Sequence, residues 1–164
     1  MTNQNDIARV WEILAGNSVG MLTTGFSDGL RSRPLDARPD RATGVIFFLT
    51  DVRGLKDDEV EARPDVCFTV TNKDSNIYLS ITARASVSRD TAKAKEIWKK
   101  NDEIWWKGGP EDSNLRVIRL VPSRAELWDG PASKLVAAYE FAKARLTGEK
   151  PLAGENTKKV VQLR

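Results

Sequence analysis

The hydrophobic positions change their period along the chain, and these changes separate predicted helices from predicted strands. Ile7, Val10, Trp11 and Leu14 recur at intervals of three and four residues, which predicts an amphipathic helix over residues 6–15. After this helix, short β-rich runs alternate with turn residues such as Asn, Asp, Gly and Pro. The predicted strands cover residues 19–24, 30–36, 45–49, 66–71, 77–87, 115–121 and 124–128.

Three further helices are predicted from capping residues and composition. The first covers residues 57–62, the second begins after Asp90 and reaches residue 100, and the third follows Ser133. Residues 147–164 are polar and are expected to form a loosely held tail. The prediction is therefore one domain over residues 1–146 with a tail over residues 147–164.

Tight turns between consecutive strands favour a mainly β fold with flanking helices. An antiparallel barrel suits this pattern best, because closing the sheet removes exposed strand edges. With 164 residues, the chain is long enough for one domain with a substantial core.

Composition excludes several classes of function. The chain has no histidine, which rules out Ser-His-Asp triads, histidine-ligated zinc and haem with a proximal histidine. An enzyme of this composition is expected to take its chemistry from a cofactor. One cysteine, no long apolar run and no secretion signal predict a soluble cytoplasmic protein without a metal site. A net charge of +3 does not by itself indicate a nucleic-acid partner.

Two arginines on the strand over residues 30–36 are candidates for anion binding. Arg31 and Arg33 fall on the same face of a strand, and Pro34 marks an edge, a bulge or a ligand. The alternative is that both are solvated arginines balanced by neighbouring aspartates.

Residues 50–56 offer donors of the kind that hold a phosphate. Thr50 supplies a hydroxyl, Lys56 a cation, and a glycine turn and a helix start lie between them. The alternative is an ordinary helix start with acidic residues in its first turn. Trp128, at the end of the last strand, is a candidate wall for a planar ligand, or else a core or subunit-interface residue.

The order of several motifs resembles the pyridoxamine 5′-phosphate oxidase-like flavin-binding split-barrel superfamily, and within it the bacterial general stress protein 26 group. The matching stretches span about residues 5–135, and it is their order and spacing that carry the resemblance. They are residues 18–24 (SVGMLTT), 31–35 (RSRPL), 48–50 (FLT) with Lys56, 78–85 (YLSITARA), 105–112 (WWKGGPED) and 125–129 (AELWD).

This resemblance implies a homodimer of six-stranded antiparallel split barrels with FMN at the subunit interface. Arg33, Pro34 and Leu35 would then line the isoalloxazine ring, with Trp128 near the flavin. Arg33 would also stabilise the negative charge that develops at N1 of the reduced ring.

The resemblance assigns the phosphate of FMN to Thr50 and Lys56. Related flavin barrels offer a serine and a further basic residue between these positions, where this chain has Gly54 and Leu55. Arg53 and Arg31 are the two candidates that would supply the missing positive charge.

The function expected from this resemblance is an FMN-dependent oxidoreductase with an unknown small-molecule redox partner and unknown catalytic residues. The alternatives are a flavin carrier or stress-related binding module without turnover, and a barrel that binds single-stranded nucleic acid. The last is disfavoured because the sequence concentrates no basic face. Pyridoxamine phosphate oxidation is not expected, since the histidine of the vitamin-processing enzymes is missing.

Overall fold

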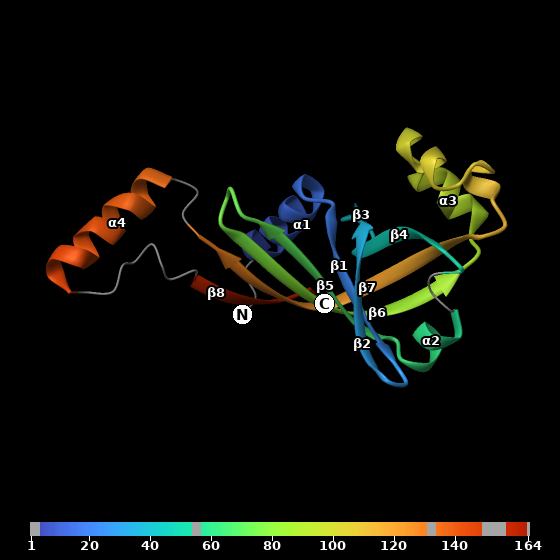
Figure 1. Ribbon diagram of the computed structural model, residues 1–164, viewed down its shortest axis with the longest axis horizontal. Helices are drawn as coiled ribbons and strands as arrows, with labels where there is room; N and C mark the ends of the chain where they lie inside the picture. The colour runs from blue at the N-terminus through green and yellow to red at the C-terminus, as the bar shows by residue number, and fades with distance from the viewer. Residues whose placement is uncertain (1–3, 54–56, 131–133, 149–156, 164) are drawn as a thin grey trace.

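The computed structural model describes residues 4–53, 57–130, 134–148 and 157–163 (Figure 1). Strands dominate it, with short helices between them and at the ends. In chain order the elements are α1 (Gln4–Gly16), β1 (Val19–Phe26), β2 (Gly29–Asp36), β3 (Arg38–Asp40), β4 (Val45–Asp51), α2 (Asp57–Ala62), β5 (Asp65–Asn72), β6 (Ile77–Ser88), α3 (Thr91–Ile97), the 3-10 helices η1 (Lys100–Ile104) and η2 (Gly109–Glu111), β7 (Leu115–Asp129), α4 (Lys134–Thr147) and β8 (Thr157–Gln162).

The strands form one antiparallel sheet in the order β2-β1-β5-β6-β7-β4-β3. β4 and β8 share one side of β7: β4 pairs with residues 115–120, and β8 pairs with residues 124–129. β2 also contacts β4, so the sheet curls back on itself. The predicted mainly β, antiparallel split-barrel fold is confirmed.

β7 is longer than predicted. Residues 115–121 and 124–128 were expected as two strands, because Pro122 and Ser123 read as a break. They form one strand, and the register between β6 and β7 shifts at Thr82 and Ala83, opposite this point. Such an irregularity in the ladder accommodates a proline, which has no N–H to donate.

The C-terminal segment also differs from expectation. Residues 157–162 form β8 instead of a loose tail, and Val161 is buried in the main core. β3 was not predicted, and α3 ends at Ile97, with the 3-10 helix η1 following it.

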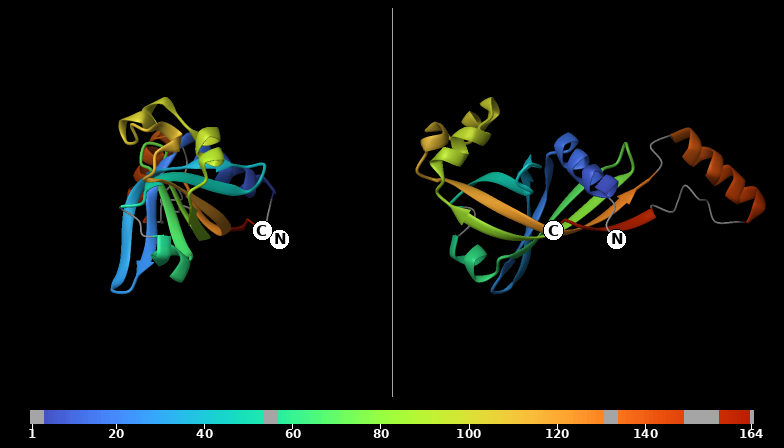
Figure 2. Two further views of the ribbon diagram at one scale, coloured as in Figure 1. Left: turned by 90° about the vertical axis from the view of Figure 1, so that its right-hand side faces the viewer. Right: turned by 180° about the vertical axis from the view of Figure 1, so that it is seen from behind.

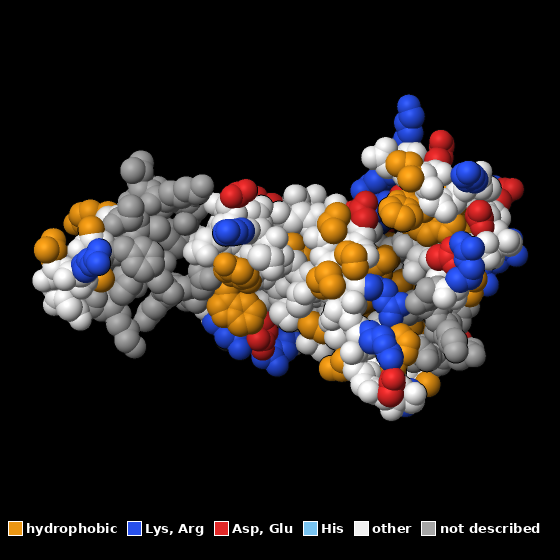
Figure 3. Space-filling model, viewed as in Figure 1, with side chains coloured by type: hydrophobic (Ala, Val, Ile, Leu, Met, Phe, Trp, Pro, Cys, Tyr) orange, Lys and Arg blue, Asp and Glu red, His pale blue; other side chains and the backbone are white. Residues whose placement is uncertain are grey.

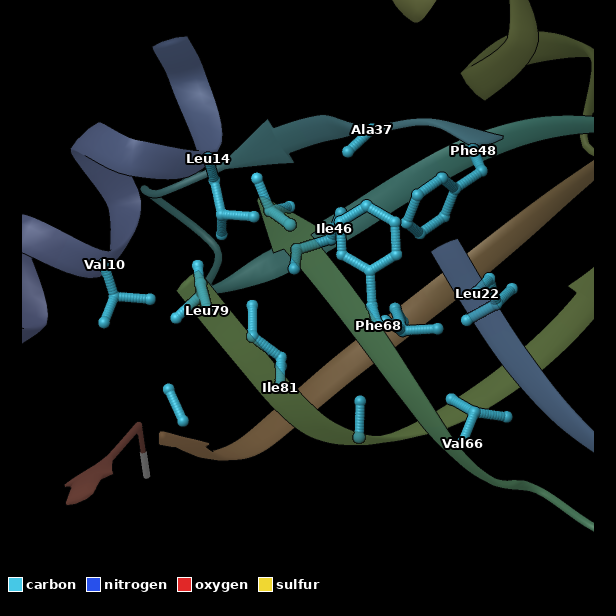
Figure 4. Close-up of a cluster of buried hydrophobic side chains, with 14 of the residues drawn as sticks. Val10, Leu14, Leu22, Ala37, Ile46, Phe48, Val66, Phe68, Leu79 and Ile81 are labelled. Carbon is cyan, nitrogen blue, oxygen red and sulfur yellow. The ribbon is translucent and has the colours of Figure 1, made fainter. Parts of the chain in front are cut away.

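The main core fills the barrel beneath α1 (Figure 4). Val10 and Leu14 of α1 pack onto it, and the rings of Phe48 and Phe68 meet edge to face with centroids 5.0 Å apart. Gly20 permits the close crossing of β1 and β5, because a Cβ atom there would lie 2.4 Å from the Thr69 carbonyl oxygen. β4 is buried along almost its whole length, as its continuous apolar run predicted.

A second, smaller cluster lies on the other face of β4 and β7. It joins Phe47 and Leu49 of β4 to Leu115, Val117 and Trp106. This cluster fixes the segment after α3 against the sheet, and the candidate site described below lies beside it.

α4 projects away from the barrel at one end of the molecule (Figures 1 and 2). Its Tyr139 and Leu146 side chains are exposed. Among the described helices, none combines the length and the apolar character needed to cross a membrane.

Candidate functional site

A cavity of about 560 Å³ opens between β2, β4 and the segment that contains η1. This volume is in the range typical of small-molecule sites. Hydrophobic side chains gather between the β1–β2 hairpin and α3 on the face shown in Figure 3, while acidic and basic side chains are mixed over the rest of that face. The cavity is lined by Val19, Pro34, Leu35, Asp36, Arg38, Leu49, Thr50, Asp51, Arg53, Asn101, Asp102, Trp105 and Trp106.

The β4 wall supplies a buried hydroxyl and a positioned cation. Thr50 is only 7% exposed, near the end of β4. Just beyond it, the carboxylate of Asp51 accepts hydrogen bonds from the backbone N–H and the guanidinium of Arg53, at 2.8, 2.8 and 2.6 Å. The hydrogen bond from the Arg53 side chain lowers the pKa of Asp51, and the same contact raises the pKa of Arg53. Both groups are therefore charged at neutral pH, and the turn holds Arg53 at the edge of the cavity.

A buried ion-pair network joins the two walls. The Arg38 guanidinium lies 3.0 Å from Oδ1 of Asp102 and 2.5 Å from Oδ2 of Asp36. Asp102 also accepts a 2.7 Å hydrogen bond from the backbone N–H of Lys99, which caps η1. Arg38 and Asp102 are each more than 90% buried. The network therefore fixes the position of η1 relative to β2 and β3.

Two tryptophans form the far wall. The backbone N–H groups of Trp105 and Trp106 both donate to the carbonyl oxygen of Asp102, at 3.0 and 3.1 Å. Trp106 is buried, and its ring lies 6.3 Å from that of Trp98, whereas Trp105 is 76% exposed at the rim. The wall therefore has one fixed indole inside and one accessible indole outside.

Three of the predicted site residues meet at this cavity. Pro34 and Leu35 line it from β2, and Thr50 lines it from β4. The strands that carry them are far apart in the sheet order, and they meet here because the sheet curls until β2 contacts β4.

The two predicted arginines of β2 lie outside the lining. Arg31 stacks over the ring of Phe26 at 4.4 Å, and its guanidinium binds Asp28. Arg33 lies 5.5 Å from the same ring and donates to the hydroxyl of Thr24. Both therefore belong to the hairpin next to the cavity.

Trp128 lies at the other end of β7. It pairs with Tyr78 of β6, and the ammonium of Lys158 lies 5.4 Å from its ring centroid. Arg116, the partner of Thr50, is twelve residues earlier on β7, about 40 Å along the strand. Lys56, Gly54 and Leu55 fall outside the described residues.

Sequence reasoning missed the polar framework of the site. Arg38 and Asp102 are 64 residues apart, and no local pattern connects them. The pair Trp105–Trp106 stands in one of the stretches that carry the family resemblance, but it was not among the predicted site residues. The signal that could have identified this pair is its position shortly before the glycine turn at Gly108–Gly109.

Comparison with known proteins agrees with this architecture. The family described as pyridoxamine 5′-phosphate oxidase like matches residues 5–152. Among curated protein sequences, none matches the chain.

Solved structures share the fold. A general stress protein 26 from Jannaschia sp. CCS1 superposes with a TM-score of 0.76 at 26% identity, over 97% of this chain and 99% of that one. A general stress FMN/FAD binding protein from Xanthomonas citri gives 0.70 at 24% identity, over 80% and 93%. A general stress protein 26 from Bacillus anthracis gives 0.67 at 22%, over 76% and 94%. The chain is therefore a member of the pyridoxamine 5′-phosphate oxidase-like family, with a split-barrel fold similar to that of the general stress protein 26 structures.

Proposed function

We propose that the cavity between β2 and β4 binds a flavin, with FMN as the preferred form, and that the protein uses it in a redox reaction. The observation that carries this proposal is the convergence of Pro34, Leu35 and Thr50 on one cavity. These are positions that the family resemblance assigns to the flavin. The similar Xanthomonas citri protein, described as an FMN/FAD binding protein, supports the same assignment.

The chemistry of the lining fits such a ligand. Apolar and aromatic side chains, Leu35 and Trp106, suit the faces of a planar ring. The Thr50 hydroxyl and the Arg53 guanidinium suit a phosphate, because hydrogen bonds from charged donors to phosphate are strong. When bound, a flavin supplies hydride and electron transfer, so the missing histidine is no obstacle.

The proposal includes a homodimer with the flavin at the subunit interface. β2 is an edge strand, most of its residues are exposed, and its Leu30 is 77% exposed. Such an edge is normally covered by another chain or protected. Because Trp128 lies far from the cavity of its own subunit, a role near the flavin requires that it reach the site from a second copy.

Binding of two flavins that differ only in their phosphate tests the phosphate assignment. Protein freed of bound flavin is titrated with FMN and with riboflavin, and quenching of flavin fluorescence gives each Kd. Thr50→Val keeps the shape but removes the hydroxyl, and it should weaken FMN binding roughly tenfold, since a hydrogen bond to a charged group is worth about 1.5–3 kcal/mol. Riboflavin affinity should change little.

Thr71→Val is the matched control, because Thr71 is exposed on β5 and does not line the cavity. Lys56→Ala should also weaken FMN more than riboflavin, as the resemblance predicts. Equal losses for both flavins would contradict the phosphate assignment, and an absence of quenching by either flavin would overturn the proposed function.

Turnover is tested separately. An oxidoreductase should be reduced by NADH or NADPH in its flavin-loaded form, with loss of the flavin absorbance. If only dithionite bleaches the flavin, the protein is a flavin carrier.

A further inference from the structure

The arginines that line the cavity are already paired with carboxylates. The Arg38 side chain is 8% exposed, and all three of its nitrogens donate hydrogen bonds, to two backbone carbonyl oxygens and to the carboxylate of Asp102. Arg53 is held by the carboxylate of Asp51. Among the described residues of the lining, every guanidinium therefore has a carboxylate partner of its own.

The charges of the lining disfavour an anion as a second ligand beside the flavin. Among the described residues, the carboxylates of Asp36, Asp51 and Asp102 and two guanidiniums line the cavity, which leaves one negative charge in excess. The phosphate that the proposed function places at Thr50 and Arg53 adds to this excess. A further anion would lose its hydration and meet repulsion in this space, at a cost that an uncharged molecule avoids.

Trp105 offers a flat apolar surface at the mouth of the same cavity. It lines the cavity and is 76% exposed, and its neighbour Ile104 is 73% exposed. Large apolar side chains that gather on an exposed surface commonly mark a binding site. Aromatic rings stack on an indole in offset or edge-to-face arrangements, so the ligand that suits this surface is itself planar and aromatic.

The backbone of Trp105 is fixed, although its ring is accessible. Its N–H donates to the carbonyl oxygen of Asp102 at 3.0 Å, and the carboxylate of Asp102 is held by Arg38. The next residue, Trp106, is buried in the cluster with Phe47. A stacking surface on a fixed backbone loses little freedom when a ligand binds.

We infer that the cavity takes a second ligand, an uncharged planar aromatic molecule that stacks on the indole of Trp105 and is the substrate of the bound flavin. The inference rests on the proposed function and deepens it by naming the chemical class of the substrate. Trp105 selects for a planar ring, and the carboxylates of Asp36 and Asp102 select against anions. Arg38 is a positioning residue, because it acts by holding Asp102.

Calorimetric titration of the FMN-loaded protein with 2-naphthalenemethanol, an uncharged two-ring probe, tests the stacking surface. Trp105→Ala should weaken binding of this probe about tenfold, and Trp105→Phe should restore most of the affinity because it restores an aromatic ring. Ile104→Ala is the matched control. Ile104 is the exposed neighbour of Trp105 and does not belong to the described lining of the cavity, so its loss should leave the affinity unchanged.

A second probe of the same shape tests the selection against anions. 2-Naphthoate has the ring system of 2-naphthalenemethanol but carries a carboxylate, and the unmodified protein should bind it about tenfold more weakly. Asp36→Asn removes one negative charge and keeps the shape of the side chain, so it should narrow this preference. Added salt should narrow it too, because salt screens charges, whereas a preference set by shape would not respond.

The outcomes separate the inference from the proposed function. If the FMN-loaded protein does not bind 2-naphthalenemethanol, or binds both probes equally well, the inference is wrong while the proposed function stands. The inference is also overturned if Trp105→Ala weakens FMN binding more than probe binding, or if it converts a dimer into monomers. Trp105 would then belong to the flavin site or to the subunit interface. If no flavin binds to the unmodified protein, the proposed function fails and the inference fails with it.

Discussion

At the scale of single residues, Arg38 does most to shape the candidate site. Its guanidinium contacts carboxylates from both walls and is almost fully buried. The sequence suggested nothing of this, because Asp102 is far along the chain and both residues are of types that normally lie at the surface. By contrast, Pro34, Leu35 and Thr50 were predicted for the site, since they stand in motifs whose order resembles a known family.

Asp102→Ala should destabilise the protein by about 3 kcal/mol. It removes the acceptor of a charge-assisted hydrogen bond from Arg38 and of the hydrogen bond from the backbone N–H of Lys99 that caps η1. Urea unfolding followed by circular dichroism measures this loss. Glu103→Ala, at the exposed neighbouring position, should change the free energy of unfolding by less than about 0.5 kcal/mol. Equal effects of the two substitutions would contradict the role of the network.

Asp36 makes stability depend on pH in a definite direction. Burial raises its pKa, but the hydrogen bond with Ser18 and the charges of Arg38 and Lys99 outweigh burial and keep the pKa below 3.8. The unfolded chain therefore takes up the proton first as the pH falls. The stabilisation is complete above the ordinary pKa and is lost as the pH falls through the lowered value.

Urea midpoints measured between pH 5 and pH 2.5 test this dependence. The unmodified protein should lose more stability over that interval than Asp36→Asn, which has no proton to bind there. Parallel curves for the two proteins would show that Asp36 does not contribute.

At the scale of elements, local turn chemistry explains which predictions were confirmed. The hairpins β1–β2 and β5–β6 were predicted because Ser27–Gly29 and Asn72–Asn76 mark tight turns between β-rich runs. β8 was missed because, over residues 158–162, Val161 alone is buried, so the sequence shows no alternation of apolar and polar positions there. β8 pairs with residues 124–129 of β7, which β4 leaves unpaired on that side. This pairing position exists only once the sheet has formed.

Val161→Ala should therefore cost about 2 kcal/mol, since it removes buried methyl groups from the main core and leaves a cavity. The free energy of unfolding in urea measures the cost. Val160→Ala, next to it and half exposed, is the control and should be nearly neutral. A neutral result for Val161→Ala would mean that β8 does not contribute to the core.

At the scale of the whole molecule, the exposed edge strand and the projecting α4 favour assembly. A 14-residue helix is marginally stable in water without packing partners, and Tyr139 and Leu146 of α4 are exposed. The sequence suggested a dimer only through the family resemblance, because no local pattern shows which surface meets a second copy.

Analytical ultracentrifugation should give a mass twice the 18.3 kDa of the chain. Leu30→Asp, on the exposed edge strand β2, should shift the protein towards monomer and reduce the flavin bound per chain. Val160→Asp, on β8, is the control and should remain dimeric. A monomeric unmodified protein with a full complement of flavin would contradict an interface site.

The most direct test of the central claim is the visible absorbance spectrum of the freshly purified protein, repeated on the soluble fraction after denaturation. Flavin binding predicts the two-band flavin spectrum, with free FMN released on unfolding and identified by its mass. A colourless protein that also leaves the fluorescence of added FMN unquenched would contradict flavin binding. The cavity between β2 and β4 would then serve a different ligand.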